Sequence, residues 1–274
     1  MTQPLSSTSS RHGQVGLTML ELMISLSLGL LLLVGIGTIY VGSSQSNRVQ
    51  EDNARIQETG RFALEIMGRS IRQAGYAAIS VLFKNPKLTF TGTPITGLNT
   101  ACPTGTPSTD VITVQYDGTA GEQDCQAGNV NAGEIVQETF FIADDALRCD
   151  ATRAVAAPAA PVACPANDAG DQLLRGIEDM QVVYGIDTNG DQATDQYTAT
   201  PATWTQVVSA RVCVLVRSDN QAIAVGRQSY LNCAGALGTA TGAAATTTAP
   251  NGDTRLRRAF VATFNLRNRV TLPP

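Results

Sequence analysis

Residues 16–42 read GLTMLELMISLSLGLLLLVGIGTIYVG, and this stretch decides how the rest of the chain is interpreted. Residues 22–42 carry no charge and match the ~20 residues that an α-helix needs to span a bilayer. Arg11 precedes the stretch, and the next basic residue is Arg48. Positive charge on that side predicts a cytoplasmic N-terminus, a single membrane pass and export of everything that follows.

Three explanations of this stretch compete, and the first two do not account for the carboxylate of Glu21. An ordinary secretory signal has an apolar run of ~7–15 residues before a small-residue cleavage site, which Gly42-Ser43-Ser44 matches only crudely. A plain signal anchor needs no carboxylate at all. A charge near mid-membrane costs roughly 2.5–3.5 kcal/mol on insertion scales, and even near the interface Glu21 requires a partner.

The hexapeptide Gly16-Leu17-Thr18-Met19-Leu20-Glu21 resembles the type IV prepilin signal. The resemblance implies that a prepilin peptidase removes residues 1–16 by cutting after Gly16, and that the new N-terminus at Leu17 is methylated. It also implies that Glu21 pairs with the Leu17 amine of a neighbouring subunit. Two charges in the low-dielectric core of a filament attract only when brought together, so the pair would set the register of subunits.

The helix is expected to continue beyond the membrane. Between residues 45 and 75, apolar side chains recur every three or four positions, which predicts one buried stripe, and Gly75 is a plausible stop. One helix over 17–74 and two helices broken near Gly42-Ser43-Ser44 both fit this pattern.

Beyond Tyr76 the apolar pattern alternates, which is typical of strands. Successive strands after a helix predict an α+β fold, with an antiparallel sheet packed on the helix. Long surface loops are expected at 151–169 and 234–254. Arg255, Arg257 and Arg258 open the last strand and are interpreted as solvated edge charges, with a partner-binding patch as the alternative. The predicted strands centre on 112–116, 133–142, 180–186, 208–216 and 260–266.

The six cysteines all follow the apolar stretch, and no pair has the CxxC spacing of a zinc or redox site. An even number in an exported domain indicates up to three disulfides, with free core cysteines as the alternative. Pairing of sequence neighbours is favoured, each pair closing one long loop: Cys102 with Cys125, Cys149 with Cys164, and Cys213 with Cys233.

One segment suggests a cofactor, and it is calcium. Oxygen-bearing side chains occur at Asp187, Asn189, Asp191 and Asp195, and Ala193 would offer a backbone carbonyl. The first three match the start of a calcium loop, but the glycine and the final glutamate of an EF-hand are missing. A hairpin turn in which Asp and Asn cap their own backbone is the alternative.

The C-terminal half selects one family. The segments DQLLRGIEDMQVVYGIDTNGDQATDQY (171–197), SARVCVLVRS (209–218) and RLRRAFVATFNLRNR (255–269) together resemble PilW-type minor pilins. The resemblance implies a minor pilin that helps to prime pilus assembly, sits at or near the tip and supports twitching motility or adhesion. A pseudopilin of a type II secretion system is the alternative.

Composition excludes other classes. The only histidine is His12, within the expected leader, so the mature chain lacks histidine catalysis and histidine metal ligands, and no enzyme activity is expected. The net charge of -4 does not favour a nucleic-acid partner. Expected partners are other minor pilins, the major pilin, the prepilin peptidase, the inner-membrane assembly platform and a tip adhesin.

The chain is therefore expected to pass from the bacterial inner membrane, with its C-terminal domain in the periplasm, to the pilus on the cell surface. Its expected parts are a cleaved leader (1–16), a transmembrane and filament-core helix (17–43), an amphipathic helix (44–75) and an extracytoplasmic β-rich, pilin-like domain with disulfide-stapled loops (76–274).

Overall fold

The computed structural model describes residues 18–78, 90, 92–102, 109–158, 166, 169–221 and 226–268, without the side chains of 100–102. The chain forms two units, Met1–Arg48 and Val49–Pro274. The fold is α+β, as predicted: a long N-terminal helix is followed by antiparallel strands.

The first element, α1, is a single helix over Met19–Gln73 and passes through residues 42–44 without a break. Its apolar stripe is buried from Ile56 to Ile71, where residues three or four apart meet the core on one side. The helix stops two residues before Gly75, whose φ of 74° is a conformation that glycine adopts without strain.

Five strands form the larger sheet in the order β1-β2-β3-β4-β5, and every neighbouring pair is antiparallel. β2 and β3 are buried along their whole length, so both faces of this sheet are covered there. The strands are β1 (Ile95–Cys102), β2 (Thr109–Asp117), β3 (Ile135–Ala143), β4 (Ala146–Ala154) and β5 (Asp171–Arg175).

Four strands form the second sheet in the order β11-β8-β6-β7, again antiparallel. β8 is the long central strand, and its valine-rich sequence suits burial on both faces. The strands are β6 (Ile177–Ile186), β7 (Gln196–Thr198), β8 (Val207–Arg217, preceded by the short 3-10 helix η1, Trp204–Gln206) and β11 (Arg257–Asn265).

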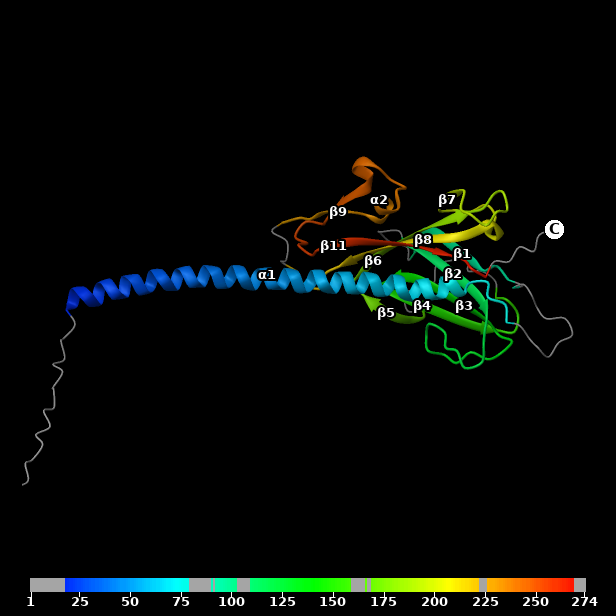
Figure 1. Cartoon of the computed structure of the whole chain (residues 1–274), viewed down its shortest axis with the longest axis horizontal. Helices are drawn as coiled ribbons and strands as arrows, with labels where there is room; N and C mark the ends of the chain where they lie inside the picture. The colour runs from blue at the N-terminus through cyan, green and yellow to red at the C-terminus, as the bar shows by residue number, and fades with distance from the viewer. Residues whose placement is uncertain are drawn as a thin grey trace, which may run out of the picture. The chain divides into compact units, whose positions relative to one another are not determined.

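One apolar core joins the second half of α1 to both sheets, and this half of the helix runs alongside them (Figure 1). Two helical glycines let β11 approach closely. A Cβ at Gly60 would collide with the ring of Phe260, and a Cβ at Gly68 with the ring of Phe264. The glycines therefore serve as sockets for the aromatic side chains of the last strand, at the expense of some helix propensity.

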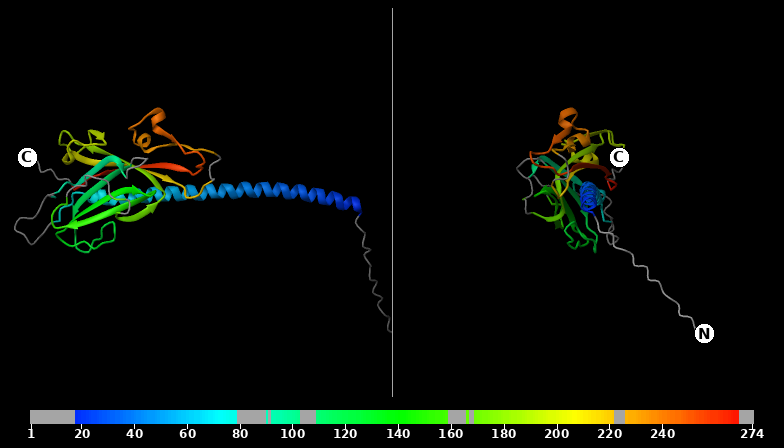
Figure 2. Two further views of the ribbon diagram at one scale, coloured as in Figure 1. Left: turned by 180° about the vertical axis from the view of Figure 1, so that it is seen from behind. Right: turned by 90° about the vertical axis from the view of Figure 1, so that its left-hand side faces the viewer.

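A smaller layer covers the other face of the four-stranded sheet (Figure 2). It contains β9 (Ser229–Leu231), α2 (Cys233–Leu237), the 3-10 helix η2 (Gly242–Ala245) and β10 (Thr246–Thr248). β9 and β10 pair as an antiparallel ribbon. The prediction of a plain surface loop at 234–254 is therefore wrong: short helical and strand segments fold back against β8.

Each of the five predicted strands is present, in β2, β3, β6, β8 and β11. The remaining strands were not predicted because they are short, polar or irregular. The predicted loop at 151–169 is wrong at its start, since β4 continues to Ala154 through polar residues.

Candidate functional site

The predicted processing residues Gly16 and Leu17 lie outside the described residues. Glu21 lies in the first turn of α1 and is exposed. Its backbone N–H donates to the hydroxyl of Thr18 at 3.3 Å, so Thr18 acts as the helix cap. A carboxylate in the first turn also complements the positive end of the helix dipole.

Residues 19–41 present apolar side chains on every side of α1. Leu31 is 70% exposed and Leu33 71%, although they lie on different faces of the helix. The helix is long and apolar enough to cross a membrane. Its serine and threonine hydroxyls return to the backbone: Ser25 donates to the Glu21 carbonyl at 2.7 Å, and Thr38 to the Gly35 carbonyl at 2.8 Å. Such bonds satisfy these hydroxyl donors in an apolar surrounding.

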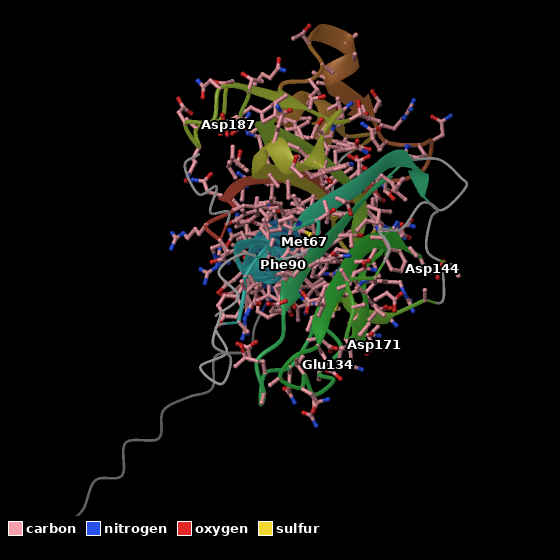
Figure 3. The ribbon with its side chains drawn as sticks, turned by 90° about the vertical axis from the view of Figure 1, so that its right-hand side faces the viewer. Met67, Phe90, Glu134, Asp144, Asp171 and Asp187 are labelled. Carbon is pink, nitrogen blue, oxygen red and sulfur yellow. A yellow bond between two sulfur atoms is a disulfide. The ribbon has the colours of Figure 1, made fainter. Side chains whose placement is uncertain are left out.

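The 187–195 loop follows β6 and lies at the margin of its domain, far from the core residue Met67 (Figure 3). Oδ1 of Asp187 accepts the N–H of Gly190 at 2.6 Å and that of Asn189 at 3.2 Å. Oδ2 of Asp187 accepts the N–H of Gln192 at 2.9 Å. The loop thus has the self-capping geometry of an Asp-Asn turn.

The same pattern continues through the loop. Asp191 accepts the N–H of Ala193 at 2.8 Å, and Asp195 accepts the N–H of Thr188 at 2.7 Å. Within the described part of the chain, no group of three or more His, Cys, Asp or Glu side chains is placed to hold a metal ion. The three predicted carboxylate ligands, Asp187, Asp191 and Asp195, therefore form no such group, and calcium binding stays a prediction.

These hydrogen bonds alter the acidity of two loop carboxyls. Burial opposes ionisation of Asp187, but the N–H groups of Gly190 and Gln192 outweigh it and lower its pKa. The hydroxyl and N–H of Thr188 lower the pKa of Asp195. Both carboxylates therefore stabilise the turn in their charged form.

Two disulfides are described. Cys213 pairs with Cys233, which confirms that prediction and fastens α2 to β8. Cys125 pairs with Cys149, so the predicted pairs of Cys102 with Cys125 and of Cys149 with Cys164 are wrong. The side chains of Cys102 and Cys164 lie outside the described residues.

The physical reason is the path of residues 118–134, which connect β2 to β3. This segment folds back along the sheet, where the buried Glu138 of β3 accepts the N–H of Cys125 at 2.7 Å. That contact brings Cys125 to Cys149 on the neighbouring strand β4. Burial raises the pKa of Glu138, and the hydroxyl of Tyr116 donates to it at 3.1 Å.

The interpretation of Arg257 as a solvated edge charge is wrong. Its side chain is only 3% exposed and forms a two-point pair with Glu178, Nε to Oε2 at 2.6 Å and Nη2 to Oε1 at 2.8 Å. Nη2 also donates to Asp253. The signal that could have revealed this pair is the acidic segment 176–179 at the start of β6, which lies across β8 from the arginines of the last strand.

A buried carboxyl group links the two sheets. Asp110 of β2 accepts the N–H of Val182 in β6 at 2.8 Å. β7 pairs only with residues 184–186 of β6, so it ends before Val182 and leaves this N–H to Asp110. The pKa of Asp110 is raised to about 7, because burial and then the charge of Asp179 raise it by more than the hydrogen bond from Val182 lowers it.

Comparison with known proteins was made at three levels. A search of curated protein sequences found no match. A solved structure of a type IV-like pilin from Thermus thermophilus is similar, with 15% sequence identity and a TM-score of 0.46, over 78% of this chain and 97% of that one. Residues 139–268 match the family model described as Type IV Pilus-assembly protein W, PilW.

The matched segment starts within β3 and ends just after β11, so it contains the whole four-stranded sheet, the layer outside it and Arg257 with its partners. It includes all three segments on which the sequence resemblance rests, except for the final residue of the last one. Residues 139–268, just under half of this chain, are therefore similar to the PilW family of type IV pilus-assembly proteins.

Proposed function

We propose that this protein is a minor type IV pilin that helps to prime pilus assembly and sits at or near the pilus tip, where it supports twitching motility or adhesion. One observation carries the proposal: the segment 139–268 that matches PilW is joined to an exposed apolar helix that has Glu21 in its first turn. Such a helix needs lipid or other helices around it. The membrane would supply the lipid first, and a filament core of parallel helices would then supply the neighbouring helices.

Processing would take place at the cytoplasmic face. A prepilin peptidase would cut between Gly16 and Leu17 and leave the whole apolar helix on the mature chain. The new amine of Leu17 would then lie one helical turn before Glu21. Between neighbouring subunits that amine and the Glu21 carboxylate would pair, and an offset subunit would leave both charges unpaired in an apolar surrounding.

The proposed surroundings follow from this path. The chain would enter the inner membrane once, with its C-terminal domain in the periplasm, and would then move into the filament. Its neighbours would be other minor pilins, the major pilin, the assembly platform and a tip adhesin. The role is structural, because binding between subunits needs no catalytic group.

The experiment compares the natural chain with Glu21→Ala and Glu21→Asp in cells with and without an active prepilin peptidase. We expect mass spectrometry to find a methylated N-terminus at Leu17 only when the peptidase is active. Glu21→Ala should leave cleavage intact but reduce surface pili and twitching, and Glu21→Asp should retain part of both. A chain that begins at Met1 or beyond residue 42 in the presence of peptidase would contradict the proposal.

A type II secretion pseudopilin would share the Glu21 helix and the same processing. Deletion of the gene distinguishes the two. A minor pilin is expected to be needed for pili and twitching while enzyme secretion continues. The reverse result, with pili intact and secretion lost, would favour the pseudopilin.

A further inference from the structure

A pocket of about 380 Å³ lies on the outer face of the four-stranded sheet, beneath the ribbon of β9 and β10. This volume is near the lower end of the ~300–1,000 Å³ usual for small-molecule sites. The sheet contributes Asp179, Leu215 and Arg257 to its wall, and the ribbon contributes Tyr230 and Thr248. Long-range folding therefore brings one aromatic ring and several polar groups to one concave surface.

The wall on the sheet side is held in place by paired charges. Glu178 lies at a β-bulge, where two residues of β6 oppose one of β8, and bulges re-aim side chains. Besides its two hydrogen bonds from Arg257, Glu178 accepts a third from Nη1 of Arg217 at 3.2 Å. Arg217 also donates to Asp145 at 2.9 Å. A wall fixed in this way loses little conformational freedom when a ligand binds.

The same pairing limits what the pocket can bind. Three carboxylates at or near the pocket already have a guanidinium partner, so they are not free to bind a cation: Glu178, Asp145 and Asp253. The carboxyl groups on the wall disfavour an anion. Asp179 is the remaining carboxyl, and burial, followed by the charge of Glu178, raises its pKa. The chemistry is therefore closest to that of a site for a neutral ligand.

Both donors and acceptors are left to such a ligand. Nη1 of Arg257 has no hydrogen-bond partner among the described residues, but this atom is buried, so it adds no donor for a ligand in the pocket. Tyr230 and Thr248 add hydroxyls, and Asp179 adds a carboxyl oxygen. A hydroxyl group both donates and accepts, so a ligand rich in hydroxyls matches this mixture better than an amine does.

The Tyr230 ring gives the pocket its apolar side. The guanidinium of Arg257 lies 5.5 Å from the centre of that ring, which fixes its orientation from the sheet side. Leu215 and Pro250 extend the apolar surface. A pyranose ring has an apolar C–H face and a polar rim of hydroxyls, and both kinds of surface are present here.

We propose that the pocket between the four-stranded sheet and the β9–β10 ribbon binds one residue of a neutral glycan, with the Tyr230 ring as its platform and Asp179 and Thr248 beside its hydroxyls. The inference does not rest on the role in pilus assembly, because it concerns the surface of the domain alone.

The test uses the full chain in non-ionic detergent on an array of neutral and acidic glycans, followed by titration of the strongest neutral glycan. Tyr230→Phe keeps the ring and removes one hydroxyl. Loss of one hydrogen bond, worth about 1 kcal/mol, should weaken binding roughly fivefold. Thr248→Val should have a similar effect. Tyr197→Phe is the matched control, since Tyr197 also lies beside an arginine, Arg211, at 4.2 Å but belongs to β7, outside the pocket.

The proposal is supported if a neutral glycan binds and both pocket variants weaken it while the control does not. It is overturned if no neutral glycan binds, if the pocket variants bind as the natural chain does, or if only acidic glycans bind. Displacement of the bound glycan by putrescine at equal concentration would also overturn it, because it would identify a site for cations.

Discussion

Replacement of Asp110 by Asn is expected to change how the stability of the domain depends on pH. Asparagine keeps an oxygen that can accept the Val182 N–H, but it cannot ionise. In the natural chain the folded carboxyl has a pKa of about 7, against an ordinary value of 3.8. A proton is therefore held more tightly in the folded state than in the unfolded state.

The sign and size of the effect follow from that difference. Between pH 4 and pH 7 unfolding releases a proton from Asp110, so raising the pH favours unfolding. The stabilisation is complete below the unfolded pKa and is lost as the pH rises through about 7. A shift of about 3 pH units corresponds to about 4 kcal/mol in the free energy of unfolding. The free energy of unfolding of Asp110→Asn, relative to that of the natural chain, should therefore rise by that amount between pH 4 and pH 8.

The assay can use Trp204, the only tryptophan in the chain, whose ring contacts Tyr184 edge-on with centroids 4.9 Å apart. Urea titrations followed by its fluorescence, at steps between pH 4 and pH 8, give the free energy of unfolding of both chains in detergent. Shifted carboxyls other than Asp179, whose charge acts on Asp110, affect the two chains equally, so their effects cancel in the difference. Parallel profiles for the two chains would refute the reasoning about Asp110.

Three further predictions concern packing, covalent links and metal. Gly68→Ala should lower the free energy of unfolding by about 1–2 kcal/mol, because the new methyl group collides with Phe264, and equal or higher stability in urea would contradict this. Joint replacement of Cys213 and Cys233 by Ser should remove about 3 kcal/mol on the chain-entropy model, for a sequence separation of 20 residues, and an unchanged urea midpoint would argue against it. If the 187–195 loop binds calcium, millimolar calcium should raise the midpoint of thermal unfolding of the natural chain but not of Asp187→Asn, and identical midpoints with calcium and with chelator would dismiss the site.

The sequence predicts the elements whose signals are local. The helix and the five alternating strands follow from periodicity, because their apolar residues recur at regular intervals within each element. The pairing of Cys213 with Cys233 is also local, because the segment between them folds back on β8. The pairing of Cys125 with Cys149 depends on how residues 118–134 return across the sheet, which no local pattern reports.

Arg257 illustrates the same limit for charged residues. A run of three basic residues at the start of an edge strand suggests exposure to solvent. Burial of one of them depends on Glu178 and Asp253, and Glu178 is 79 residues away in sequence. The pocket above this pair likewise combines residues from both ends of the PilW segment. Its chemistry becomes visible only once the sheet register is known.

The sockets of Gly60 and Gly68 have a consequence for the timing of folding during the export proposed above. Phe260 follows Gly60 by 200 residues, so the contact that closes the core joins the first element of the domain to its last strand. Contacts between such distant residues form late, because the intervening chain must be ordered first. A domain that is still emerging from the translocation channel would lack β11, and its helix stripe would stay open to chaperones and proteases. Only after export is complete would β11 close the core, and only then would the subunit be ready for assembly.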